Sequence, residues 1–137
     1  MSHKTTINTK VSSLSSLQKA LDRLGIKYKV GNHKTRGNYG VHEDVDVILE
    51  NYGGKSLNNA VGFKQGKDGN FQFTGDFYGL RDDQGNSLSQ NNFGDRVENA
   101  YNFEEINNKL STLGFSCDNS NLDFTKKEVN FVMQRMV

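Results

Sequence analysis

The sequence predicts an α+β fold organised as a ferredoxin-like split βαβ core, in which two helices cover one face of an antiparallel sheet with extra strands. Aromatic residues alternate with polar ones in a hairpin pattern near the middle of the chain, and an apolar stripe at helical spacing lies on either side of it. Strand-like segments flank both stripes. The 137 residues suit one domain, 1–137.

The central hairpin is predicted over Ala60–Tyr78. Two alternating runs flank a turn-rich loop at 65–70, whose glycine, asparagine and aspartate residues suit a tight reversal. A period of two places the aromatic rings on one face of the sheet: Phe63, Phe71, Phe73 and Phe77. Because each ring brings a large apolar area to bury, we expect this hairpin to form the centre of the core.

The segment before the hairpin predicts a strand, a helix and two further strands. Thr5–Val11 alternates as a first strand, Ser12-Ser13 offers an N-cap, and four leucines spaced by three, four and three residues lead to a stop at Gly25. Ile26–Val30 then alternates as a half-buried strand. Gly31–Gly40 is polar and is predicted as a loop, and residues 41–50 alternate as the next strand.

The segment after the hairpin predicts a loop over Gly79–Gly94, an interrupted helix, a short strand from Phe115 and a closing hairpin. The charged residues of the loop and helix are expected on the surface: Arg81, Asp82, Asp83, Arg96 and Glu98. The helix carries two apolar sets on opposite sides: Val97, Ala100 and Tyr101 against Phe103, Ile106, Leu110 and Leu113. Asn102 and Glu105 resemble a capping box, which predicts a break or kink near Asn102. The closing hairpin pairs 122–124 with 129–136.

Composition limits the classes of protein and site. There is no long apolar run and no apolar stretch after the basic N-terminus, so we expect neither a membrane span nor a secretory signal, and a cytoplasmic protein. The single cysteine, Cys117, excludes an intramolecular disulfide. With no histidine near it in sequence, Cys117 is expected to be a buried thiol.

The charge is nearly balanced overall but unevenly placed. The chain carries a net +1 at pH 7, yet residues up to Arg36 hold eight basic side chains against one acidic, a net +7, which leaves −6 for the remainder. A basic face of this kind can contact a nucleic acid or an acidic partner. It can equally be neutralised by the acidic remainder of the folded chain or pair head-to-tail with another copy. We favour these alternatives over nucleic-acid binding, because nucleic-acid modules usually carry a clear basic excess.

Several short motifs follow one another in a distinctive order: Met1-Ser2-His3, Ile7-Asn8-Thr9-Lys10, the leucine helix ending at Gly25, Val61-Gly62-Phe63, Ala100-Tyr101 and Gly114-Phe115. In this order the chain resembles the proteins named for hypothetical chloroplast reading frame 35, a family of unknown function from algal plastids and cyanobacteria. Two features depart from that family: Lys4 stands where it usually has an aromatic residue, and Gly79–Asn92 is differently composed. They suggest a distant member, for instance from a marine bacterium or phage. The resemblance implies a small soluble protein of photosynthetic lineages, in the plastid stroma if plastid-encoded, and implies no chemistry.

The first candidate site is a metal site formed by His42, Asp44 and Asp46. On an extended strand, alternate side chains project from one face about 7 Å apart. An imidazole and two carboxylates suit a divalent cation. Because neighbours on one strand are too far apart to chelate alone, a solvated polar face is the competing interpretation.

The second candidate is a binding or acid–base group, made by His33 and Arg36 of the polar loop with Asp76 of the central hairpin. Imidazole and carboxylate side chains can exchange protons, and a guanidinium can hold an anion. Nothing in the spacing of the three residues places them within reach of one another.

Three functions stay open. The one we favour is a non-catalytic binding or accessory module that engages an unidentified protein partner through its sheet face or loops, and that could form a homodimer. The second is a small dimeric ferredoxin-like enzyme or ligand-binding protein with a pocket between helices and sheet. The third is nucleic-acid binding through the basic N-terminal part, where only Tyr28 and Tyr39 supply aromatic rings. The sequence assembles no recognisable catalytic set and leaves any cofactor unknown.

Overall fold

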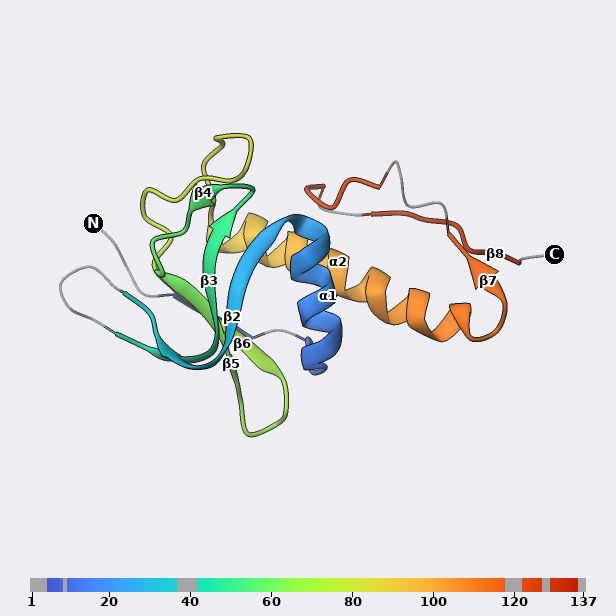
Figure 1. Cartoon of the computed structure of the whole chain (residues 1–137), viewed down its shortest axis with the longest axis horizontal. Coiled ribbons are helices and arrows are strands. Elements are labelled where there is room, and N and C mark those ends of the chain that lie inside the picture. The colour runs from blue at the N-terminus through green and yellow to red at the C-terminus, as the bar shows by residue number, and fades with distance from the viewer. Residues whose placement is uncertain (1–4, 9, 37–41, 118–121, 127–128, 136–137) are drawn as a thin grey trace.

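A computed structural model describes residues 5–8, 10–36, 42–117, 122–126 and 129–135 (Figure 1). Within these residues the predicted α+β class is confirmed. The elements, in chain order, are β1 (Thr5–Asn8), α1 (Leu14–Leu24), β2 (Ile26–Lys34), β3 (Asp44–Tyr52), β4 (Lys55–Ser56), β5 (Val61–Gln65), β6 (Phe71–Gly75), α2 (Gln90–Ser111), β7 (Phe115–Ser116) and β8 (Gln134–Arg135). Neither α1 nor α2 has the length and apolar character that a membrane crossing requires.

The main sheet has the strand order β1-β6-β5-β3-β2, with β4 paired to the end of β3, and every pair is antiparallel. The ferredoxin-like core is not confirmed, because β1 lies at an edge against β6 and the strand after α2 does not join this sheet. β7 pairs instead with β8 in a separate sheet. Since α2 spans 22 residues, or about 33 Å, it carries β7 beyond the main sheet, as Figure 1 shows.

The predicted central hairpin is confirmed. β5 and β6 pair with Phe63 opposite Phe73, and the two ring centroids lie 4.8 Å apart in an edge-to-face contact. One core cluster joins these rings to Leu17 and Leu21 of α1 and to Phe93 of α2. Both helices therefore pack on the face of the sheet that carries the phenylalanines.

Helix α1 forms where the leucine spacing predicts it. Ser13 caps its N-terminus, because the Ser13 side chain accepts a hydrogen bond from Ser16 N at 3.3 Å. Gly25 ends the helix at φ 78°, a left-handed conformation that costs glycine little. Leu17 and Leu21 are fully buried. Local capping and apolar spacing are thus sufficient to define this element.

Helix α2 begins earlier than the sequence predicts. Ser89 and Asn92 form a reciprocal capping box, in which each side chain accepts a hydrogen bond from the other residue's backbone N–H. The helix therefore starts at Gln90, and residues 90–94, predicted as the end of a loop, are its first residues. Their polar composition resembles a loop, but here Ser89 caps the helix and Asn92 takes the N3 position of the capping box.

The predicted break of α2 near Asn102 is wrong, because the helix is continuous from Gln90 to Ser111. Val97, Ala100 and Tyr101 belong to the same core cluster as Phe103, and the ring of Phe103 also packs against Phe124 and Phe131, with centroid distances of 5.7 and 4.9 Å. Of the second apolar set only Phe103 is buried, whereas Ile106 is 40% and Leu113 is 64% exposed, so the helix continues without a break and leaves part of that set at the surface.

The closing hairpin is also wrong as predicted. Among the residues that the structure describes, β8 pairs with β7, and residues 122–124 pair with no strand. The C-terminal segment follows α2 through its aromatic contacts with Phe103 and through a hydrogen bond from Asn99 Nδ2 to Lys126 O at 2.9 Å. Side-chain packing against α2 thus holds this segment in place of the backbone hydrogen bonds of the predicted hairpin. Part of the predicted turn, residues 127–128, lies outside the described residues.

Candidate functional site

A bulge in β2 shapes the end of the β2–β3 hairpin. Val30 pairs with Val47, but the next described pair is His33 with Val45, so two residues of β2 lie opposite one of β3. One of the two, Gly31, has φ 128°, a backbone conformation that side-chain-bearing residues rarely adopt. The first four residues of the predicted loop at 31–40 therefore belong to a bulged strand. Bulges redirect the side chains that follow them, here towards a neighbouring pocket.

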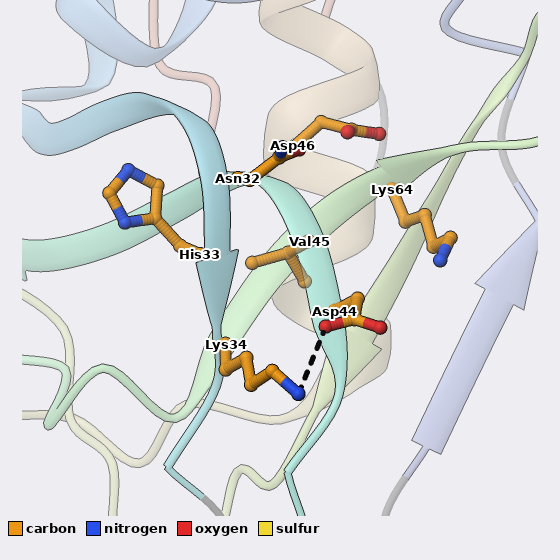
Figure 2. A pocket seen from close by; sticks show the side chains of 7 residues that line it. All are labelled: Asn32, His33, Lys34, Asp44, Val45, Asp46 and Lys64. Atoms are coloured by element: carbon orange, nitrogen blue, oxygen red, sulfur yellow. Dashed lines mark ion pairs between the residues drawn. The ribbon is translucent and has the colours of Figure 1, made fainter.

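The pocket lies beside this bulge and has a volume of about 470 Å³ (Figure 2). Three neighbouring strands line it, and all of its lining side chains except one valine are polar or charged. They are Asn32, His33 and Lys34 of β2, Asp44, Val45 and Asp46 of β3, and Lys64 of β5. The site thus combines two cations, two carboxylates, an imidazole and an amide.

A close approach between two strands supports the apolar part of the pocket. Val45 is only 2% exposed, and β5 meets β3 at Gly62. A Cβ at Gly62 would lie 2.5 Å from the carbonyl oxygen of Val47 and 3.0 Å from Cγ1 of Val45. Neither atom belongs to a long flexible side chain that could move aside. Only glycine fits here without displacing β3, and β3 carries three of the pocket residues.

The substitution Gly62→Ala is expected to lower the free energy of unfolding by about 1–3 kcal/mol, because the added methyl group overpacks this contact. Gly94→Ala is the matched control. Gly94 lies inside α2 with no atom within 4 Å of its added Cβ, so alanine should raise the free energy of unfolding by about 0.5–1 kcal/mol through helix propensity. Denaturant titration measures both. Changes of the same sign would contradict the close approach at Gly62.

The charged side chains of the pocket differ in the ion pairs and hydrogen bonds that they form. Lys34 Nζ lies 3.6 Å from Asp44 Oδ1, but these side chains are 71% and 67% exposed, so the pair contributes little to stability. Asp46 Oδ2 accepts a hydrogen bond from Gln65 N at 2.8 Å, which ties the start of β3 to β5. Among the described residues Lys64 forms no ion pair within 4.0 Å. The pocket therefore presents an ammonium and part of a carboxylate that the chain itself leaves available.

The structure separates the three predicted metal ligands. Asp44 and Asp46 line the pocket, but His42 precedes β3 and does not. Its Nδ1 donates a hydrogen bond to the carbonyl oxygen of Thr35 at 2.8 Å, across the base of the hairpin. In the described part of the chain, no group of three His, Cys, Asp or Glu side chains is placed to hold a metal ion. The expectation that all three project from one strand is wrong for His42, and metal binding itself stays a prediction.

The second predicted group is divided as well. His33 lines the pocket, whereas Arg36 and Asp76 do not. The backbones of Arg36 and Asp76 both bind the segment that leads into β5. Arg36 N donates a hydrogen bond to Asn59 O at 2.6 Å, and Asp76 N donates one to Ala60 O at 3.1 Å. Arg36 and Asp76 are thus brought to neighbouring positions, and the pocket holds His33 with other partners.

Two residues that the sequence assigned to the surface form a buried ion pair. Asp82 and Arg96 are 2% and 7% exposed, and Arg96 Nη1 lies 3.0 Å from Asp82 Oδ2 and 3.4 Å from the hydroxyl of Tyr52. The other carboxylate oxygen of Asp82 accepts backbone N–H groups from Gln84 and Asn86, both at 2.9 Å. This cluster anchors the loop between β6 and α2 onto the helix.

One sequence signal could have found the pair. Arg96 lies three residues after the buried Phe93 and four before the buried Ala100, which is the spacing of the core-facing side of a helix. Burial alone would raise the pKa of the Asp82 carboxyl. Hydrogen bonds to its charged form, from Asn86, Arg96 and Gln84, outweigh burial, so the pKa is lowered.

The basic N-terminal part is neutralised in part by the rest of the chain, as favoured from the sequence. Arg23 Nε lies 2.5 Å from Glu104 Oε1, Lys29 pairs with Glu50 at 3.6 Å, and Lys34 pairs with Asp44. Arg23 also stacks over the ring of Phe103, 4.7 Å from its centroid. The acidic partners of these three cations come from β3 and α2.

Residues 20–126 match the family described as "Protein of unknown function (DUF1257)". This match covers more than half of the chain. The chain belongs to the DUF1257 family. The DUF1257 match includes every residue of the pocket and both partners of the buried ion pair, and leaves β1 and β8 outside. No curated protein and no solved structure matches the DUF1257 chain.

Proposed function

We propose that this DUF1257 chain is a non-catalytic binding module and that the charged pocket is its binding site. The observation that carries the proposal is the convergence of two unusual backbone features on this pocket. Gly31, with its positive φ, directly precedes the lining residue Asn32, and the missing Cβ of Gly62 leaves room for the lining residue Val45, so each position is restricted to glycine. Gly62 also permits the packing of β5 on β3, and β3 carries three of the lining residues, so both features help to position the lining of the pocket.

The chemistry of the lining favours binding over catalysis. The lining residues include no hydroxyl or thiol that could act as a nucleophile beside His33. Lys34 and Asp44 are more than half exposed, and electrostatic catalysis depends on charges from which water is excluded. A site of this kind selects a ligand by its charge pattern.

Titration of the full chain followed by two-dimensional amide NMR tests the proposal. The probes are acetate, ethylammonium, inorganic phosphate and zwitterionic amino acids. We expect at least one of them to shift the amide signals of 32–34, 44–46 and 64, and to leave those of α1 unchanged. If every probe leaves the signals of the pocket unmoved up to its solubility limit, the assignment of this pocket as a binding site is wrong.

The predicted metal site forms a separate proposal, in which His42, Asp44 and Asp46 bind a divalent cation. The hydrogen bond from Nδ1 of His42 to a backbone carbonyl leaves Nε2 as the ring nitrogen able to ligate, an arrangement common in metal sites. Zinc titration by calorimetry should show stoichiometric binding that is lost in the double variant His42→Ala with Asp44→Ala. Stoichiometric binding retained by that variant would contradict the site.

We also propose that the chain is a distant relative of the proteins named for hypothetical chloroplast reading frame 35. The ordered motifs, among them Val61-Gly62-Phe63 and Gly114-Phe115, support the proposal. The structure adds a physical reason for the first motif, because Gly62 permits the close approach of β5 to β3. A family model built only from those proteins should match residues 20–126, and a failure to match would contradict the proposed relationship.

A further inference from the structure

We infer that the ligand of the charged pocket is a small zwitterion, a molecule that carries an ammonium group and a carboxylate. The inference rests on the proposed binding function and specifies the ligand of the same site. It starts from the two charges that the pocket leaves available, the carboxylate of Asp46 and the ammonium of Lys64.

Lys34 and Asp44 already neutralise each other. Figure 2 shows their side chains facing one another, joined by the ion pair of 3.6 Å. Asp46 uses one carboxylate oxygen to accept a hydrogen bond from Gln65 N. No ion pair with a described residue is formed by Lys64 or by Asp46. One positive and one negative charge therefore line the pocket without a direct ion pair between them.

The register of the sheet brings these two charges to the same site. Asp46 precedes Val47 on β3, Lys64 follows Phe63 on β5, and Val47 pairs with Phe63. The hydrogen bond from Gln65 N holds the Asp46 carboxylate against the strand that carries Lys64. The two groups are neighbours along the pocket wall, although they lie more than 4.0 Å apart.

This arrangement discriminates against ligands with a single charge. An anion that approaches Lys64 is repelled by Asp46, and a cation that approaches Asp46 is repelled by Lys64. A ligand with both charges satisfies both groups, with its carboxylate on Lys64 and its ammonium on Asp46. Asn32 and His33 add further hydrogen-bonding groups to the same pocket.

A series of unbranched amino acids tests the inference by varying the distance between the two ligand charges. The probes are glycine, β-alanine, 4-aminobutanoate and 6-aminohexanoate, with acetate and ethylammonium as single-charge controls, titrated into the full chain by amide NMR. We expect one chain length to bind best. Acetate and ethylammonium should each bind about two- to fivefold more weakly, the factor that one exposed ion pair supplies.

Charge-removing variants give a second readout. Lys64→Met should abolish the preference for the zwitterion over ethylammonium, and Asp46→Asn, which keeps an acceptor for Gln65 N, should abolish the preference over acetate. Lys67→Met and Asp68→Asn make the same charge changes in the exposed turn between β5 and β6 and should leave all affinities unchanged. If Asp46 or Lys64 had only a structural role, its substitution would weaken the binding of every probe equally.

The outcomes separate this inference from the proposed function. If acetate or ethylammonium shifts the signals of the pocket as strongly as the best amino acid, the pocket binds a single charge. The zwitterion inference is then wrong, and the binding function stands. If no probe shifts these signals, both are wrong.

Discussion

Replacing Asp82 with alanine is expected to lower the free energy of unfolding by about 3–5 kcal/mol, because it leaves the buried guanidinium of Arg96 without its counter-charge. The carboxylate is 2% exposed, and it also holds the backbone N–H groups of Gln84 and Asn86. Chemical denaturation of the wild type and the variant measures the difference. The exposed neighbour Asp83 supplies the control, since Asp83→Ala should change stability by less than about 0.5 kcal/mol.

A double-mutant cycle separates the ion pair from the loop contacts. Arg96→Leu alone should also be destabilising, since it leaves the Asp82 carboxylate buried without its cation. The double variant Asp82→Ala with Arg96→Leu should be less destabilised than the sum of the two single variants, because neither charge is then left unpaired. Additive effects would show that Asp82 acts through the loop alone.

The pH dependence follows from the lowered pKa of Asp82. A lowered pKa means that the folded chain stabilises the ionised carboxylate more than the unfolded chain does. This contribution to the free energy of unfolding is complete above the ordinary pKa of 3.8 and is lost as the pH falls through the lower pKa of the folded chain. The stability difference between the wild type and Asp82→Ala should therefore be full at neutral pH and shrink below about pH 4. A difference unchanged to pH 2 would contradict the lowered pKa.

Replacing Phe73 with alanine is expected to lower the free energy of unfolding by about 3–5 kcal/mol, because it opens a cavity at the centre of the core. Phe73 is 1% exposed, and its ring centroid lies 4.8 Å from that of Phe63, 5.1 Å from that of Phe77 and 4.9 Å from that of Phe93. It thus joins the hairpin to α2. Thermal and denaturant unfolding measure the effect.

Tyr78 provides the matched control for Phe73. It lies on the same segment of chain and is 68% exposed, so Tyr78→Ala should change stability by less than about 0.5 kcal/mol. A comparable loss in both variants would mean that Phe73 does not form the centre of the core.

Local patterns carried the accurate part of the sequence prediction. The leucine spacing, Ser13 and Gly25 predicted α1, and the alternating phenylalanines predicted the hairpin of β5 and β6. In both cases the residues that form the element are close to one another in the sequence. Apolar periodicity and turn chemistry therefore predict the element directly. The break predicted at Asn102 is wrong because it was inferred from local pattern alone. Its cause would have been local, but the neighbours that bury Phe103 come from the C-terminal segment.

The sequence by itself determined the α+β class, the central hairpin, the first helix and the candidacy of His33, Asp44 and Asp46 as site residues. The tertiary structure alone decided that these three share a pocket with Lys64 and that Arg96 meets Asp82 inside the fold. Both juxtapositions depend on long-range geometry. A one-residue change in the register of β2 against β3, or a helix start shifted by one residue, would redirect these side chains while leaving the sequence pattern almost unchanged.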